Sequence, residues 1–126
     1  MSSPESLRGA VEAWIADDPD AGDQAELRSL LDRGSYDELQ DRFAGRLTFG
    51  TAGLRGVVAA GPNRMNRAVV RAATAAVAGW LGGSGSVALG CDARHRSAEF
   101  ADEAARVLAG AGIKVRSEER RVGKEC

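Results

Sequence analysis

Apolar residues in the first third of the chain recur at helical spacing. Residues 6–16 and 22–33 each place their aliphatic side chains on one face, which predicts two amphipathic helices. A shorter third helix is expected to run through Phe43, with Ser35 as its N-cap and Glu38 three residues later. That spacing is typical of a capping box, in which each residue bonds the other's backbone N–H. The chain is therefore expected to begin with a helical segment.

The next strong helical pattern covers about residues 67–81. Asn66 directly precedes it and has the side chain of a good N-cap. The apolar stripe of this helix includes Trp80 and Leu81, whereas Arg67 and Arg71 fall on another face and are expected to be solvated.

The last third of the chain has the pattern of a strand, a helix and a second strand. Residues 87–91 form a short apolar run, 98–109 an amphipathic helix that Ser97 can cap, and 113–115 the start of another strand. A βαβ unit of this length implies two parallel strands. The pattern then breaks, and residues 116–126 are expected to be a non-native or disordered tail.

Composition places the protein among globular chains of one modest domain. Its 126 residues are 44% hydrophobic, and no run is long and apolar enough to suggest a membrane span. The N-terminus lacks the basic and apolar regions of a secretory signal. Cys91 and Cys126 suggest neither a disulfide framework nor a metal site, so a reducing cytoplasmic location is expected.

Charge divides the chain into two unlike parts. Residues 1–41 contain 11 acids and 3 bases, whereas residues 42–126 contain 7 acids and 14 bases. The bases of the second part are almost all arginine, whose planar fork suits phosphate or carboxylate. A compositional bias towards arginine, alanine and glycine explains the same count, so composition leaves both interpretations open.

A glycine-rich segment, GTAGLRG at residues 50–56, follows a short extended stretch at 47–49. Glycine lets the backbone approach a ligand closely, and Arg55 can add two parallel donors for an anion. The segment is neither a P-loop nor a dinucleotide-binding fingerprint. A glycine-rich hairpin with an exposed arginine fits the spacing equally well.

A second candidate anion site lies between the strand at 87–91 and the following helix. Asp92, Arg94 and His95 are in this loop. Ligands of open α/β sheets bind outside the carboxyl ends of the strands, and a helix N-terminus favours anions. This placement favours anion recognition, with Asp92 orienting Arg94; the alternative is a purely structural Asp92–Arg94 ion pair. The sequence contains no evident catalytic triad, carboxylate pair or metal cluster.

Three segments in order resemble the opening motifs of the α-D-phosphohexomutases, the phosphoglucomutase/phosphomannomutase family. They are LTFGTAGLRG at 47–56, GPNRMN at 61–66 and GCDARHRS at 90–97. Their spacing is similar to that of the branch that includes phosphoglucomutases and phosphopentomutases. The resemblance implies an α/β fold: an acidic helical N-terminal extension at 1–46, followed by an incomplete βαβ-containing first domain at 47–115.

The resemblance also implies a chemistry. Members of this family are four-domain isomerases in which a serine of the first domain carries a phosphate and exchanges it with a phosphosugar through a bisphosphorylated intermediate. Magnesium, held by a loop of the second domain, and a sugar bisphosphate activator are expected; no nucleic-acid or membrane partner is. Arg55 would support catalysis beside the phosphoserine. The expected phosphate- and substrate-binding residues are Thr51, Gly53, Arg55, Gly56, Asp92, Arg94 and His95.

The chain lacks both the Thr-Ala-Ser-His-Asn-Pro segment that would carry the phosphoserine and the Asp-Gly-Asp metal loop. Phosphoryl transfer depends on a positioned nucleophile and charge stabilisation. We therefore expect an N-terminal fragment of a mutase, inactive alone, with no metal ligand of its own. Two alternatives remain, a non-enzymatic anion-binding α/β module and a structural fragment without a ligand, and the choice of sugar stays open.

Overall fold

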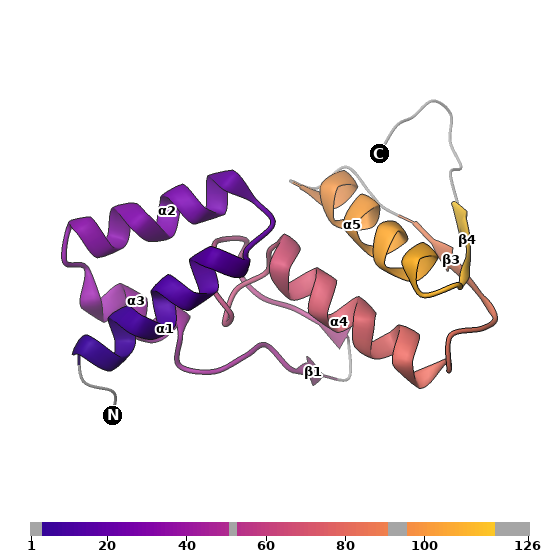
Figure 1. The fold of residues 1–126 in the computed structure, drawn as a ribbon, viewed down its shortest axis with the longest axis horizontal. Coiled ribbons are helices and arrows are strands. Elements are labelled where there is room, and N and C mark those ends of the chain that lie inside the picture. Colours follow the sequence, from indigo (N-terminus) through magenta and orange to yellow (C-terminus); the bar gives the residue numbers. More distant parts are fainter. Residues whose placement is uncertain (1–3, 51–52, 91–95, 118–126) are drawn as a thin grey trace. The chain divides into compact units, whose positions relative to one another are not determined.

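The computed structural model describes residues 4–50, 53–90 and 96–117 (Figure 1). The chain forms two compact units, Met1–Val69 and Val70–Cys126. The domain boundaries predicted from the sequence, at 46/47 and 115/116, do not coincide with this division, and they stay predictions. Within the described ranges, no helix is long and apolar enough to cross a membrane.

Three helices form the core of the first unit, as the apolar spacing predicted. They are α1 (Pro4–Asp17), α2 (Ala21–Asp32) and α3 (Tyr36–Arg42). Trp14 and Phe43 pack against the core and form a T-shaped pair with each other, with ring centroids 6.2 Å apart. The buried apolar cluster consists of Leu7, Val11, Ile15, Leu27, Leu30, Leu31, Leu39 and Ala60.

The turn between α1 and α2 is held by side chains that satisfy helix ends. Asp20 Oδ1 accepts a hydrogen bond from the backbone N–H of Asp23 at 3.0 Å and so caps α2. Gln24 Nε2 donates to the carbonyl oxygens of Ile15, at 2.7 Å, and Asp18, at 3.0 Å. These bonds satisfy carbonyl groups at the end of α1 that have no partner within their own helix.

The predicted capping box of α3 is wrong. Ser35 does precede the helix, but its side chain makes no capping hydrogen bond and its ψ of 63° is not the extended conformation of an N-cap. Glu38 instead accepts a hydrogen bond from Arg42 Nε at 3.0 Å. Arg42 carries a full positive charge and the backbone N–H does not, so the attraction between opposite charges favours the bond to the arginine.

The glycine-rich segment forms a small antiparallel hairpin. Strand β1 (Phe49–Gly50) pairs with β2 (Gly53–Leu54), with Gly50 opposite Gly53. Gly53 has a φ of +99°, a conformation that strongly favours glycine. The extended stretch therefore lies slightly later than the predicted 47–49. The glycine-rich hairpin, one of the two interpretations of the sequence, is present.

Helix α4 (Arg67–Trp80) begins directly after Asn66, as predicted. Asn66 Oδ1 accepts a hydrogen bond from the backbone N–H of Val69 at 3.0 Å, which confirms the N-cap. The predicted apolar stripe does not match the observed burial along α4, because Trp80 is 85% exposed whereas Ala78 is buried. Ala78 belongs to the core of the second unit, together with Leu108 and Ile113.

The second unit contains the predicted βαβ arrangement. Strand β3 (Ser86–Leu89), helix α5 (Ser97–Gly110) and strand β4 (Lys114–Ser117) follow in order, and β3 and β4 are parallel. The register pairs Ser86 with Lys114 and Leu89 with Ser117, so β4 continues two residues past the predicted Val115. The partly buried side chains that pack against the core of this unit are Leu81, Val87, Leu89 and Val115.

The N-terminus of α5 differs from the prediction in one respect. Ser97 is the first helical residue, and the N-cap position belongs to Arg96. Arg96 has a left-handed φ of 66° and makes no side-chain capping bond. Its guanidinium lies 2.6 Å from Glu99 Oε1 and 5.3 Å from the centre of the Phe100 ring. The arginine is held by its own helix through an ion pair and a cation–π contact.

Candidate functional site

Both ends of the glycine hairpin are attached to the loop that follows it. Before β1, the backbone N–H of Leu47 donates to the carbonyl oxygen of Pro62 at 3.2 Å. After β2, the carbonyl oxygen of Val57 accepts from the N–H of Met65 at 2.8 Å, and Ala59 N–H donates to Met65 at 3.2 Å. The hairpin is therefore held at its base by residues 59–66, which we call the clamp loop.

Two glycines allow the close packing around this base. A Cβ atom on Gly56 would lie 2.6 Å from Leu47 Cδ1, so only glycine fits without a shift of the leucine. Gly61, with a φ of +113°, would place a Cβ atom 3.1 Å from Arg42 Cβ. The first glycine brings the two ends of the hairpin together, and the second brings the clamp loop against α3.

Asn66 ties the clamp loop to itself. Its side chain is fully buried, and Nδ2 donates to the carbonyl oxygens of Ala59 and Gly61, both at 2.8 Å. Its Oδ1 is the acceptor that caps α4. One side chain thus bonds two loop carbonyls and one helix N–H, and in doing so has all its own polar atoms paired in the interior.

Arg42 connects the clamp loop to two acidic helices. Its Nη1 donates to Glu26 Oε2 at 2.5 Å and to the carbonyl oxygen of Ala60 at 3.3 Å, and its Nε donates to Glu38 at 3.0 Å. Burial acts to lower the pKa of Arg42, but the hydrogen bonds and charges of Glu26 and Glu38 outweigh it and raise the pKa above its ordinary value. The guanidinium is held firmly in its charged form.

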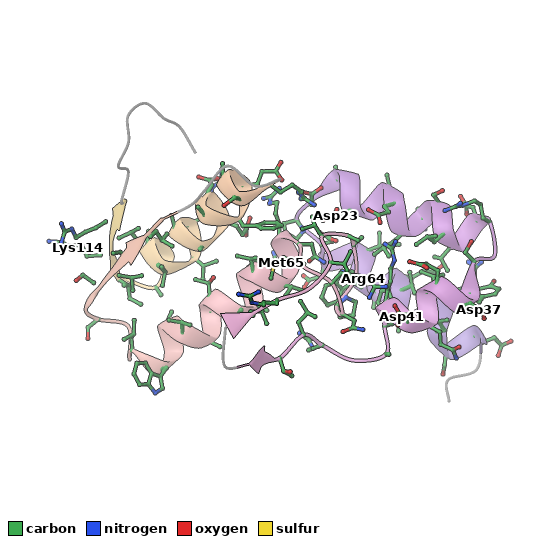
Figure 2. The ribbon with its side chains drawn as sticks, turned by 180° about the vertical axis from the view of Figure 1, so that it is seen from behind. Asp23, Asp37, Asp41, Arg64, Met65 and Lys114 are labelled. Atoms are coloured by element: carbon green, nitrogen blue, oxygen red, sulfur yellow. The ribbon has the colours of Figure 1, made fainter. Side chains whose placement is uncertain are left out.

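Arg64 makes a second link between the clamp loop and α3. Its guanidinium forms an ion pair with Asp41 and lies 3.9 Å from Glu38 Oε2 (Figure 2). It also donates to the carbonyl oxygen of Asn63 at 3.0 Å. The side chain is only 12% exposed, so Arg64 is a structural residue of this unit.

Arg67 is only 25% exposed, whereas a solvated side chain was predicted. Its guanidinium donates to the carbonyl oxygen of Pro19 at 3.3 Å and lies 3.9 Å from Asp20 Oδ2. Arg42, Arg64 and Arg67 thus belong to the basic part of the chain and pair with carboxylates of the acidic part. These ion pairs account for part of the charge asymmetry along the chain. The opposite charges of the two parts were the available sequence signal for these contacts.

Arg55 differs from these three arginines. It follows β2 directly, is exposed to solvent, and takes no part in the ion pairs that join the clamp loop to the helices. Gly53, with its positive φ, and Gly56, which lies close to Leu47, are on either side of it in the sequence. An exposed guanidinium beside a glycine hairpin can present two N–H groups to an anion.

The other predicted site residues lie outside the described residues. They are Thr51, which follows β1 in the sequence, and Asp92, Arg94 and His95, which lie between β3 and α5 in the sequence. Whether the hairpin and that loop form one site therefore stays a prediction. Among the residues with a described position, no group of three or more histidine, cysteine, aspartate or glutamate side chains could hold a metal ion.

Comparisons with known proteins give a consistent family assignment. Residues 46–119 match the sequence model of phosphoglucomutase/phosphomannomutase, alpha/beta/alpha domain I. The chain is 33% identical over 116 residues to a phosphoribomutase of Saccharomyces cerevisiae, covering 89% of the chain and 19% of that relative. It is 33% identical over 96 residues to a phosphoglucomutase of Staphylococcus haemolyticus, covering 74% of the chain and 18% of that relative.

The matched region has clear limits. The chain spans about a fifth of the length of these curated relatives, at 19% and 18%. No solved structure matches it. The α/β architecture, with its helical beginning and its parallel β3–β4 pair, is that expected of an incomplete first domain. From the matched region and these relatives, the chain belongs to the phosphoglucomutase/phosphomannomutase family.

Proposed function

We propose that this chain is the N-terminal part of a phosphosugar mutase. The complete enzyme would move a phosphoryl group between the 1-position and the terminal hydroxyl of a hexose or pentose phosphate, by way of a phosphoserine. Family membership and relatives named phosphoribomutase and phosphoglucomutase support an isomerase of this kind. The observation that carries the proposal is the exposed Arg55 beside a hairpin whose base is fixed.

The contrast between Arg55 and its neighbours gives this observation its weight. Arg42 and Arg64 have their guanidinium groups occupied by carboxylates and loop carbonyls. Arg55 is exposed to solvent, and the glycines near it in the sequence have no side chain that could block a ligand. A phosphoryl group could approach it closely, and two parallel N–H donors would stabilise the charge on the transferring oxygens.

The remaining site residues enter the proposal by their place in the sequence. We assign phosphate or substrate binding to Thr51, Gly53 and Gly56 of the glycine-rich segment. We assign the same role to Asp92, Arg94 and His95, which follow β3 in the sequence. Mg²⁺ in the complete enzyme would neutralise phosphate charge, and a sugar bisphosphate would serve as activator. Among the described residues no cluster could hold a metal ion, so we assign no magnesium ligand to them.

The chain by itself is proposed to be inactive, because its sequence has no phosphoserine segment. A cytoplasmic location is proposed from the two scattered cysteines. Phosphosugars are the proposed partners, with neither nucleic acid nor membrane involved.

The test uses protein from the complete reading frame that contains this chain. Glucose 1-phosphate and ribose 1-phosphate would each be supplied with Mg²⁺, and formation of the terminal phosphate ester measured. Arg55→Ala should lower kcat about a hundredfold or more, as expected when a charge-assisted donor to a transition state is lost. Arg33→Ala is the matched control, because Arg33 is exposed at the end of α2 and its side chain donates to the Ser29 carbonyl of that helix.

Absence of isomerisation with both sugars would contradict the mutase assignment. If such a protein still bound inorganic phosphate, and lost that binding in Arg55→Ala, the alternative of a non-enzymatic anion-binding module would be supported. Equal, small effects of Arg55→Ala and Arg33→Ala on kcat would remove Arg55 from the catalytic site.

A further inference from the structure

We propose that Arg42 is a positioning residue for the glycine hairpin. It would hold the clamp loop, residues 59–66, against the acidic helices, and the clamp loop in turn holds both ends of the hairpin that leads to Arg55. The structural part of this inference is independent of the enzyme's activity. Its catalytic consequence rests on the proposed function.

The first link joins Arg42 to the clamp loop on both sides of Gly61. On one side, Arg42 Nη1 donates to the carbonyl oxygen of Ala60 at 3.3 Å. On the other, the backbone carbonyl of Arg42 accepts from the N–H of Asn63 at 2.9 Å. Gly61 lies between these two bonds and would bring a Cβ atom within 3.1 Å of Arg42 Cβ. The loop is therefore seated directly on this residue.

The second link holds the Arg42 side chain in place from the helical side. Glu26 of α2 and Glu38 of α3 bind different nitrogens of the same guanidinium, at 2.5 and 3.0 Å. The arginine side chain is 11% exposed, whereas the two carboxylates are 38% and 47% exposed. The fork of an arginine suits three acceptors in one plane, which an ammonium group cannot reproduce.

The third link runs from the clamp loop to the hairpin. Pro62, between the two Arg42 contacts, accepts from Leu47 N–H before β1, and Met65 N–H donates to Val57 after β2. Leu47 and Gly56 then touch, because Gly56 has no Cβ atom. A shift of the clamp loop would consequently move both ends of the hairpin. Arg55, which lies next to Gly56, would move with them.

The rival explanation is that Arg42 only stabilises the helical core. The two explanations differ in what loosens when the guanidinium is removed. A general loss of stability lowers the protection of every amide that exchanges by global unfolding, whereas loss of a local clamp lowers protection only where the clamp acts. Hydrogen exchange at single amides separates them.

Hydrogen exchange would be measured on the chain and on Arg42→Ala. We expect protection of the Leu47 and Met65 amides to fall about tenfold or more, with the core amides of Leu30 and Leu31 changed about twofold at most. Arg42→Lys should fall between wild type and Arg42→Ala. Arg8→Ala is the control, since exposed Arg8 pairs with Glu12 on its own helix at 3.4 Å. Equal loss at all four amides, or no loss at Leu47 and Met65, would overturn the proposal.

The catalytic consequence is tested by a double-mutant cycle in the complete protein. Arg42→Ala should lower kcat about tenfold with little change in KM when Arg55 is present, and change kcat about twofold at most in an Arg55→Ala background. An equal effect in both backgrounds would show that Arg42 does not act through Arg55. A protein without mutase activity would refute the proposed function, and the exchange measurement alone would then decide the structural role of Arg42.

Discussion

A Cβ atom on Gly56 would lie 2.6 Å from Leu47 Cδ1, so these two residues close the base of the hairpin by direct contact. Gly56→Ala should therefore destabilise the chain by about 1 to 2 kcal/mol, through overpacking against a partly buried leucine that can move only in part. The measurement is the free energy of unfolding in urea. Leu47→Ala removes the clashing atoms, so Gly56→Ala in that background should cost much less. An equal cost in both backgrounds would show that backbone conformation, and not the leucine, requires glycine.

Gly61 and Gly34 provide a graded pair of left-handed glycines. Gly34 has a φ of +68° and only a Tyr36 ring atom at 3.9 Å, so Gly34→Ala should cost about 1 kcal/mol. Gly61 has a φ of +113° and faces Arg42 Cβ at 3.1 Å, so Gly61→Ala should cost about 2 to 3 kcal/mol, from strain and contact together. Urea denaturation of both variants checks the order. A Gly61→Ala variant as stable as Gly34→Ala would contradict the close seating of the clamp loop.

The two functions of Asn66 can be separated by a single-atom change. Asn66→Asp keeps the oxygen that accepts from Val69 N–H but replaces the amide that donates to Ala59 and Gly61. The new oxygen would face two carbonyl groups in a fully buried position. We expect Asn66→Asp to lose about 3 kcal/mol, at least as much as Asn66→Ala, despite keeping the cap acceptor. Thermal or urea unfolding decides; an aspartate variant close to wild type would mean that capping is the main contribution of this residue.

Substitution of the two tryptophans by alanine should affect the free energy of unfolding to very different extents. Trp80 is 85% exposed, so Trp80→Ala should change the free energy of unfolding by about 0.5 kcal/mol or less. Trp14 packs against Phe43, but its indole Nε1 is buried without a hydrogen-bond partner. Trp14→Ala should therefore cost about 2 to 3 kcal/mol, whereas Trp14→Phe should stay within about 1 kcal/mol of wild type, because it also removes the unsatisfied donor. A large loss in Trp80→Ala would mean that this side chain is covered in solution.

Local patterns in the sequence were sufficient for most of the elements. Apolar spacing predicted the first two helices and the βαβ order, and the position of Asn66 before an amphipathic stretch predicted the cap of α4. These features depend on residues within a turn or two of each other, or on a periodicity that a single face of a helix must satisfy. The three ordered motifs likewise indicated the family that the comparisons show.

Local patterns failed where neighbouring elements compete for the same group. Ser35 and Glu38 have the spacing of a capping box, yet Glu38 binds Arg42 instead. Arg67 has the spacing of a solvated side chain, yet it binds Pro19, which lies far away in the sequence. Apolar spacing likewise includes Trp80 in a stripe, although it is exposed. Contacts between distant elements account for two of these outcomes: Arg67 binds Pro19, and Arg42 is itself held by Glu26 of α2.

The sequence by itself determined that acidic and basic parts would be present, that a glycine segment would contain Arg55, and that a buried-type strand would precede a helix. Only the tertiary structure decided which arginines are occupied by which carboxylates. Charge is the reason: the acidic helices offer many similar carboxylates, and the choice of Glu26 and Glu38 for Arg42 follows from packing that brings α2, α3 and the clamp loop together. Arg55, by contrast, stays exposed to solvent.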